Sequence, residues 1–207
     1  MTPPLVLPRT FYARPTLEVS RDLIGKVLVH QATAGLTSGV IVEVEAYIGE
    51  ADPACHAAPG PTARNAPLYG RPGVAYVYLN YGIHNLVNAV TEEEGSPAAV
   101  LIRALEPFDG EPLMRRRRAR GTTRHASAFD SMELCRGPGN LTRALAITLR
   151  HNRMDLTASA LRIEDHGLPS REVVWSRRIG INVGTDVEWR CTARESEAVS
   201  GRHARLR

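Results

Sequence analysis

Apolar and polar residues alternate most clearly over residues 40–48. Val42, Val44, Ala46 and Ile48 would lie on one face of a strand, and Ile41, Glu43, Glu45 and Tyr47 on the other. Successive side chains of a strand point to opposite faces of its sheet. The pattern therefore predicts a strand with one face in the core and a second, polar face that is available for another role.

Shorter patterns predict the remainder of a sheet. Residues 74–80 and 83–90 flank the turn sequence Asn80-Tyr81-Gly82, as the two arms of a β-hairpin would. Residues 26–29 and 98–106 also have strand character, and short strands near residue 173 and over 180–189 would complete the sheet.

Helical periodicity occurs in three places. A short helix is expected to begin at Thr16 and end at Gly25, and two more are expected over residues 113–120 and 141–147. Residues 49–73, which are rich in proline and glycine, predict a long loop. Loops of that length in a small domain usually carry function or move.

Composition indicates one soluble domain. The chain has 207 residues, of which 43% are apolar and 23% charged, as in ordinary globular proteins. We expect residues 1–8 and 201–207 to be flexible. No stretch resembles a signal peptide or a membrane span, and the three cysteines form no C-x-x-C pair. These features predict a cytoplasmic protein, nucleoid-associated if prokaryotic, without disulfides, metal or cofactor.

Charge is distributed unevenly along the chain. Residues 1–112 carry seven basic and twelve acidic side chains, whereas residues 113–207 carry nineteen and ten. A basic C-terminal half suggests a polyanionic partner. The alternative is that the arginine content reflects genomic base composition, since only Lys26 among the 26 basic residues is a lysine.

Tyrosines gather near the acidic strand. Five of the six tyrosines fall within residues 39–103, beside Glu43 and Glu45. Aromatic side chains with a carboxylate among them suit an enzyme that grips an unstacked base and attacks its sugar. Without further information, the two glutamates are equally the polar face of an amphipathic strand.

A series of motifs resembles one enzyme family. The matching segments, in chain order, are FYARP (residues 11–15), LIGKVL (23–28), VEVEAYIG (42–49), His56, TARN (62–65), GVAYVYLNYG (73–82), Asn88, LIRALEP (101–107) and LCRGPGNL (134–141). Together they resemble the alkyladenine (3-methyladenine) DNA glycosylases. The chain departs from the family's pattern at Asn140, where the family usually has lysine, and over residues 195–200.

The resemblance implies a fold and a way of binding DNA. We expect a single compact α+β domain spanning residues 1–207, with a curved, mainly antiparallel sheet flanked by helices and a protruding hairpin that inserts into DNA. Tyr81 at the hairpin tip would fill the gap left by the rotated nucleotide. The alternative is that Tyr81 packs on its own hairpin.

The resemblance also implies catalytic and binding residues. Glu45 would be the general base that activates water for attack on C1′ of the sugar, with Arg103 as its partner. Tyr47, His56 and Tyr78 would form the walls of the base pocket, and Tyr76 would orient His56. Asn88 matches a residue that crowds the 2-amino group of normal guanine; it could equally satisfy a strand end.

The implied partner is double-stranded DNA that contains damaged purines, bound by a monomer that contacts no membrane. The substrates would be 3-methyladenine, 7-methylguanine, hypoxanthine and ethenoadenine, removed in base excision repair. With a single lysine available, we expect a monofunctional enzyme that uses water and leaves an abasic site. A non-catalytic lesion-binding protein and a basic RNA-binding module are the alternatives. The arginine run 115–118 could contact the DNA backbone or be a solvated helix face.

Overall fold

A computed structural model of the chain describes residues 4–201. Its strands are β1 (Leu5–Val6), β2 (Val27–Ala32), β3 (Gly35–Ile48), β4 (Ala75–Asn80), β5 (His84–Val90), β6 (Ala98–Asp109), β7 (Leu161–Asp165), β8 (Val173–Ser176) and β9 (Arg190–Ala193). Its α-helices are α1 (Arg9–Tyr12), α2 (Thr16–Leu23), α3 (Glu111–Ala119) and α4 (Pro138–Leu145). Four 3₁₀ turns join them: η1 (Ala66–Tyr69), η2 (Ala126–Ala128), η3 (Ser131–Glu133) and η4 (Leu149–His151).

The strands form one antiparallel sheet in the order β1-β7-β2-β3-β6-β5-β4, with β9 and β8 added alongside β3. The sheet curls into a half-barrel, so the expected α+β class with a curved antiparallel sheet is confirmed. The long strand β3 changes partner along its length. Its first part pairs with β2 and residues 43–45 pair with β9, while β6 runs along the opposite edge of the strand.

Two β-bulges mark the place where β3 changes partner. Val42 of β3 and Arg103 of β6 each lack a cross-strand partner, because the pairing steps from Ile41–Leu105 to Glu43–Ala104 and then to Val44–Ile102. Bulges are common beside active sites because they redirect side chains. Arg103 therefore has no directly paired residue on β3.

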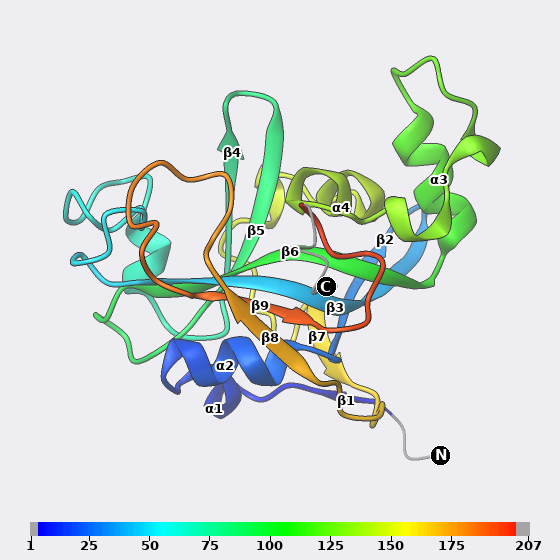
Figure 1. The fold of residues 1–207 in the computed structure, drawn as a ribbon. Helices are drawn as coiled ribbons and strands as arrows, with labels where there is room; N and C mark the ends of the chain where they lie inside the picture. The colour runs from blue at the N-terminus through cyan, green and yellow to red at the C-terminus, as the bar shows by residue number, and fades with distance from the viewer. Residues whose placement is uncertain (1–3, 202–207) are drawn as a thin grey trace.

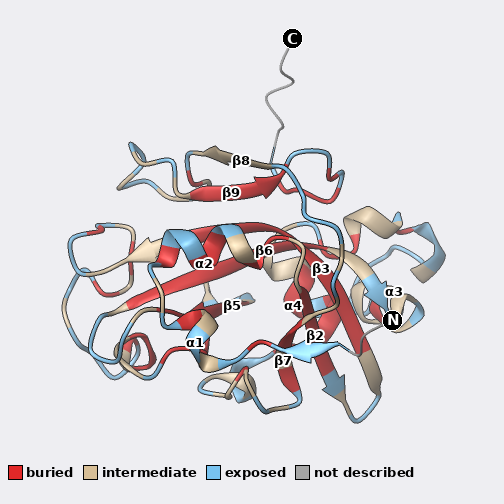
Figure 2. Cartoon of the chain, turned by 90° about the horizontal axis from the view of Figure 1, so that it is seen from below, coloured by how far each residue is buried: buried red, intermediate tan, exposed pale blue. Residues whose placement is uncertain are grey.

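Helices and loops cover the two faces of the sheet differently (Figure 1). Helices α1 and α2 pack below it, whereas α3, α4 and the β4–β5 hairpin stand above it. The loop of residues 49–73 and the segment between β8 and β9 lie on the far side of the hairpin from α3 and α4. The middle of the sheet is buried from both sides, as the red strands in Figure 2 show.

The structure differs from some predictions made from the sequence. The polar face of residues 40–48 is as buried as the apolar face, because the side chains of Arg103 and Arg190 and the backbone of Ser200 bond to Glu43. The last strand is β9, residues 190–193, rather than residues 180–189, and β1 and β7 were not anticipated. Within the segment expected to be flexible, Leu5 and Val6 pair with β7 and Leu7 is buried.

The other expected flexible positions, residues 1–3 and 202–207, lie outside the described part of the chain. Between residues 4 and 201 there is no helix with the length and apolar character needed to cross a membrane.

Candidate active site

The carboxylate of Glu45 is held by three hydrogen bonds in the second half of β3. Its Oε2 accepts from the hydroxyl of Tyr47 at 2.9 Å and from Nη1 of Arg103 at 3.0 Å, and its Oε1 accepts from the backbone N–H of Ile179 at 2.8 Å. The side chain has no exposed surface. An ionised carboxylate offers about four acceptor positions, so one remains for a further donor such as water.

Arg103 is fixed between two carboxylates. Its Nε donates to Glu43 at 3.1 Å while its Nη1 donates to Glu45, a consequence of its free position in the bulge. Burial lowers the pKa of Arg103, but the charges of Glu45 and Glu43 more than compensate and leave the pKa above its ordinary value. The guanidinium is thus a permanent, oriented cation beside Glu45.

Glu43 accepts hydrogen bonds from three residues of this network. It has no exposed surface and accepts from Arg103, from Nε of Arg190 at 2.8 Å, and from the backbone N–H and hydroxyl of Ser200 at 2.6 and 2.9 Å. Arg190 also donates to the carbonyl of Ser200. Residues 195–200 depart from the family's pattern, yet they pack firmly here, with Ala198 and Val199 buried.

A buried ion pair that sequence reasoning missed holds the segment carrying Ile179. Arg178 donates to both carboxylate oxygens of Asp52 at 2.6 and 2.8 Å, and the two side chains are 0% and 1% exposed. Its guanidinium also stacks on the rings of Tyr47 and Trp189, 4.7 and 5.2 Å from their centroids. The two residues lie far apart in the chain, so no local pattern could have revealed the pair.

An aromatic pocket of about 310 Å³ opens beside this network. Tyr47, His56 and Tyr78 line it, as expected, together with Tyr76, Tyr81, Asn88 and Arg103. Glu45 does not line the pocket itself; it lies directly behind Tyr47, Arg103 and Ile179, which do. The structure therefore brings together all eight residues that the sequence singled out, with the carboxylate one layer deeper than the pocket wall.

His56 is hydrogen-bonded to Tyr76. Its Nδ1 is 2.8 Å from the Tyr76 hydroxyl, and its ring lies edge-on to Tyr78 with centroids 4.4 Å apart. Burial, and then the charge of Arg64, lower the pKa of His56, so its ring is neutral at pH 7. Burial raises the pKa of Tyr76 to about 12. The protonated phenol can donate to Nδ1, which leaves Nε2–H as a donor for a bound base.

Asn88 has a structural bond and also faces the pocket. Its Nδ2 donates to the carbonyl of Tyr76 at 2.9 Å, which immobilises a side chain that is 4% exposed. Both roles considered for Asn88 are therefore compatible with its position on β5, opposite Tyr76.

Tyr81 stands at the tip of the β4–β5 hairpin. Its φ is 48° and that of Gly82 is 70°, and the N–H of Ile83 donates to the carbonyl of Asn80. Positive φ at both central residues is the signature of a type I′ turn. Tyr81 is 83% exposed and Ile83 is 73% exposed. Two large apolar side chains thus project from the tip and do not pack on the hairpin.

Asn140, the other departure from the family's pattern, accepts a hydrogen bond from Arg118 of α3. A cation therefore stands beside this position although the residue itself is neutral. Over residues 4–201, no three His, Cys, Asp or Glu side chains are grouped so that they could hold a metal ion.

Residues 10–197 match the sequence model of the methylpurine-DNA glycosylases. The chain belongs to this family. It is also 48% identical over 200 residues to a protein of Methanocella arvoryzae, covering 95% of this chain and 96% of the relative. A Chlorobium phaeobacteroides protein is 44% identical over 196 residues, with 94% of each chain covered. A Rhodopseudomonas palustris protein is 48% identical over 195 residues, with 94% and 90% covered.

Each of these three relatives carries the name "Putative 3-methyladenine DNA glycosylase". Membership of the methylpurine-DNA glycosylase family confirms the predicted resemblance and the predicted class of enzyme, a DNA glycosylase of DNA repair that cleaves N-glycosyl bonds.

Proposed function

We propose that this methylpurine-DNA glycosylase flips damaged purines out of duplex DNA and excises them with a water molecule activated by Glu45, leaving an abasic site. One observation carries the proposal: the Glu45 carboxylate is hydrogen-bonded to Tyr47, Arg103 and Ile179, all of which line the aromatic pocket. A fixed carboxylate directly behind the wall of a base-sized pocket suits the proposed sugar chemistry.

The pocket would hold the extruded base between aromatic faces. Arg178 lies over the ring of Tyr47, and Tyr47 lines the cavity together with Tyr78 and His56. Faces of this kind attract electron-poor, alkylated rings by cation–π interaction. His56 would offer Nε2–H to the base, and Asn88 would crowd a 2-amino group.

The proposed chemistry replaces a C–N bond by a C–O bond. As the bond between C1′ and the base nitrogen breaks, positive charge develops on the sugar and the Glu45 carboxylate stabilises it. Water on the open acceptor position of Glu45 attacks C1′, one proton passes to Glu45, and the base departs with the bonding electron pair. Arg103 would orient the same water.

Tyr81 would enter the duplex where the nucleotide leaves. Extrusion of a base costs a few kcal/mol of stacking and pairing, and an inserted ring recovers part of it. The exposure of Tyr81 and its place in the type I′ turn favour this role over packing on the hairpin.

The scarcity of amines also favours a mechanism that uses water. Strand-nicking glycosylases commonly form a Schiff base between an amine and the sugar. The one lysine, Lys26, directly precedes β2 and is paired with Asp165 at 2.5 Å, outside the pocket. Borohydride is therefore expected to trap no covalent adduct with substrate DNA, and a trapped adduct would overturn this part of the proposal.

The deciding experiment measures release of free base from methylated duplex DNA by the native protein and by Glu45→Gln. We expect Glu45→Gln to bind the duplex and to lose release. Glu106→Gln, which alters a carboxylate paired with Arg171 outside the pocket, is the matched control and should release base normally. Equal release by Glu45→Gln and the native protein would remove Glu45 from its role.

Other functions give different results in the same assay. A lesion-binding protein would bind damaged duplex without any release by the native chain, and an RNA-binding module would prefer RNA. Oligonucleotides carrying 3-methyladenine, 7-methylguanine, hypoxanthine or ethenoadenine would rank the proposed substrates. The proposed setting is base excision repair in the cytoplasm, by a monomer on chromosomal DNA.

A further inference from the structure

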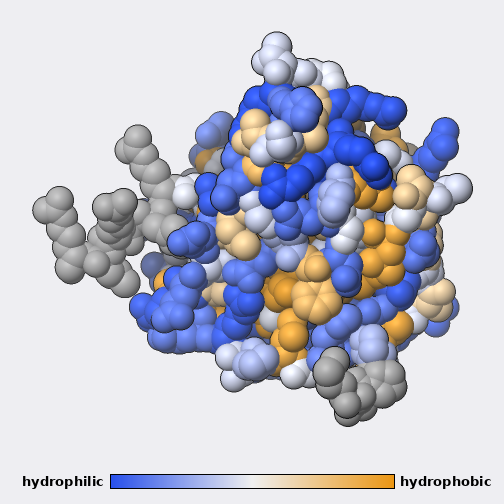
Figure 3. All heavy atoms as spheres, turned by 90° about the vertical axis from the view of Figure 1, so that its right-hand side faces the viewer, coloured by the Kyte–Doolittle hydropathy of each residue, from blue (hydrophilic) through white to orange (hydrophobic). Residues whose placement is uncertain are grey.

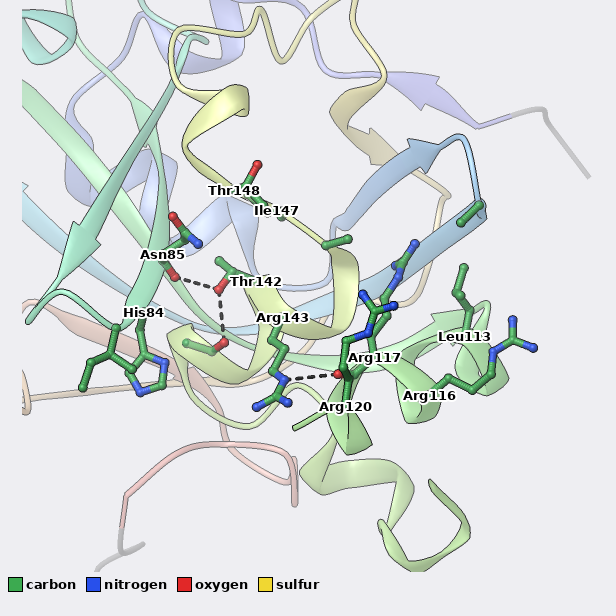
Figure 4. A pocket seen from close by; sticks show the side chains of 14 residues that line it. His84, Asn85, Leu113, Arg116, Arg117, Arg120, Thr142, Arg143, Ile147 and Thr148 are labelled. Carbon is green, nitrogen blue, oxygen red and sulfur yellow. Dashed lines mark hydrogen bonds between the residues drawn. The ribbon is translucent and has the colours of Figure 1, made fainter. Parts of the chain in front are cut away.

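A second, larger cavity lies on the other side of the hairpin from the base pocket. It is a groove of about 690 Å³ between the hairpin, α4 and α3. Its walls include Arg116 and Arg117 from α3, Arg120 directly after that helix, Arg143 from α4, and His84 from β5 (Figure 4). No acidic side chain of residues 4–201 is among those that line it.

The structure separates the arginines of this region into two groups. Arg115 pairs with Glu111, Arg117 donates to Thr37 and to the carbonyl of Ala144, and Arg118 donates to Asn140. These three are half-buried and brace α3 against its neighbours. Contacts within the protein therefore explain three of the four arginines in the run 115–118, and no ligand is needed to explain them.

The other group makes a single such bond among residues 4–201. Arg116, Arg120 and Arg143 are exposed. Neither Arg116 nor Arg120 has a side-chain hydrogen bond or ion pair to any residue between 4 and 201 that the structure describes. Arg143 uses only Nε, which donates to the carbonyl of Arg117 at 3.1 Å. Its two Nη groups remain available, so several donors in the groove have no protein acceptor.

Like charges in the groove repel one another. Arg116 lies in the last turn of α3, Arg120 directly follows the helix, and both line the groove, where like charges disfavour one another. Burial, and then the neighbouring charge of Arg116, lower the pKa of Arg117. The helix dipole favours cations in the last turn of α3, but it does not explain Arg143 on a second helix. An anion in the groove would relieve the repulsion.

The groove is joined rigidly to the hairpin. Thr142 of α4 donates to the carbonyl of Asn85 at 2.6 Å. A Cβ at Gly139 would lie 2.8 Å from the ring of His84, so glycine lets the hairpin and α4 approach this closely. Ile83, which projects beside Tyr81 at the tip, is also one of the groove residues. A duplex seated on the tip would therefore extend over the groove.

We propose that Arg116, Arg120 and Arg143 bind the phosphodiester backbone of duplex DNA beside the flipped nucleotide. The proposal rests on the proposed function, because it takes the hairpin tip as the point of entry into the duplex. Figure 3 views the molecule from the α3 side, and strongly hydrophilic side chains dominate the upper part of that face. Arginine suits this task because its planar fork matches phosphate oxygens.

The test compares two triple variants that remove the same charge. One is Arg116→Ala with Arg120→Ala and Arg143→Ala. The control is Arg21→Ala with Arg171→Ala and Arg194→Ala, three arginines of surface ion pairs outside the groove. Duplex affinity is measured between about 50 and 200 mM salt, where each phosphate contact contributes a slope of about −0.9 in log K against log salt.

We expect the groove variant to lose more than tenfold in duplex affinity at the low-salt end and to have a slope shallower by about two to three. Raising the concentration of the variant should restore base release. The control should keep the native slope. If the two triple variants bind duplex with the same affinity and slope, the proposal is wrong. It is also wrong if the groove variant loses affinity for single-stranded RNA and keeps that for duplex DNA.

The outcomes separate this proposal from the proposed chemistry. A native protein that releases no base but shows the expected change of slope would keep the groove and overturn the excision mechanism. Normal base release by the native protein, with an unchanged salt slope in the groove variant, would keep the excision mechanism and overturn the groove proposal. Arg→Gln substitutions at the same three positions repeat the test with longer, polar side chains if the alanine variant folds poorly.

Discussion

Charged side chains on the two sides of the β4–β5 hairpin differ in burial and in their contacts. On the pocket side, Glu45, Arg103 and Arg178 are buried, and each is held by hydrogen bonds to protein partners. On the groove side, Arg116 and Arg120 are exposed and have no such partners among the described residues. The pocket is preorganised, and the groove is not.

The difference follows from what each side is proposed to do. Stabilising charge at one atom of the sugar requires donors and acceptors held in place before the reaction. Neutralising a DNA backbone requires only cations near the phosphates, and the resulting affinity depends on salt. Rigid networks are therefore expected where the chemistry occurs, and free arginines where the strand is held.

Breaking the buried pair of Arg178 should disturb the pocket side most. Arg178→Met leaves the buried Asp52 without its cationic partner and frees the segment that brings Ile179 to Glu45. Removing one member of a buried pair costs about 3–5 kcal/mol, which lowers the melting temperature by about 10 °C at this chain length. Thermal unfolding and base release measure the two losses.

Arg171→Met is the matched control, because Arg171 pairs with Glu106 nearer the surface. Surface pairs contribute about 1 kcal/mol or less. The salt dependence of duplex binding should be native in both variants. A change of slope in Arg178→Met would contradict the separation of the two sides.

Tyr81 lies on the boundary between the two sides, so its removal should have a smaller effect. Tyr81→Ala is expected to reduce base release at limiting enzyme about tenfold, because the gap left by a flipped nucleotide stays unfilled. Leu149→Ala, which removes an exposed apolar side chain of η4, should leave release unchanged. Native release by Tyr81→Ala would show that the side chain does not act as a wedge.

The smallest expected effect is a pH dependence confined to the pocket. Burial and Arg64 lower the pKa of His56, so release should be constant above the ordinary histidine pKa of about 6.5 and decline only at lower pH. The imidazolium would then lose the hydrogen bond from Tyr76 and repel a cationic base. His56→Gln should remove this part of the decline, whereas His125→Gln, in the exposed η2 region, should retain it.

Duplex affinity should not follow the same pH profile, because arginines keep their charge throughout. A parallel decline of affinity and release would mean that the two sides are coupled.

Periodicity predicted the strands of the sheet better than their surroundings. Alternation over residues 40–48 and the turn at residues 80–82 correspond to β3 and to the hairpin. The burial of Glu43 was not predictable from that alternation, because its partners Arg190 and Ser200 come from the other end of the chain.

The candidate site was predictable residue by residue only through the resemblance to a family. Local patterns alone left Glu45 as one of two polar residues on a strand. The bulge that frees Arg103 depends on the register between β3 and β6, and the pairing of Arg178 with Asp52 depends on tertiary contact. The arginine run could be divided into bracing and free side chains only from coordinates.

The most direct test of the account is the single-turnover rate of base release from methylated duplex DNA by the native protein, Glu45→Gln and Glu106→Gln, each with enzyme in excess. General-base catalysis is worth about 10²–10⁴ in rate, so Glu45→Gln should be slower by at least about a hundredfold while it binds the duplex with native affinity and salt slope. Glu106→Gln should react at the native rate. Release by Glu45→Gln at the native rate would contradict the account.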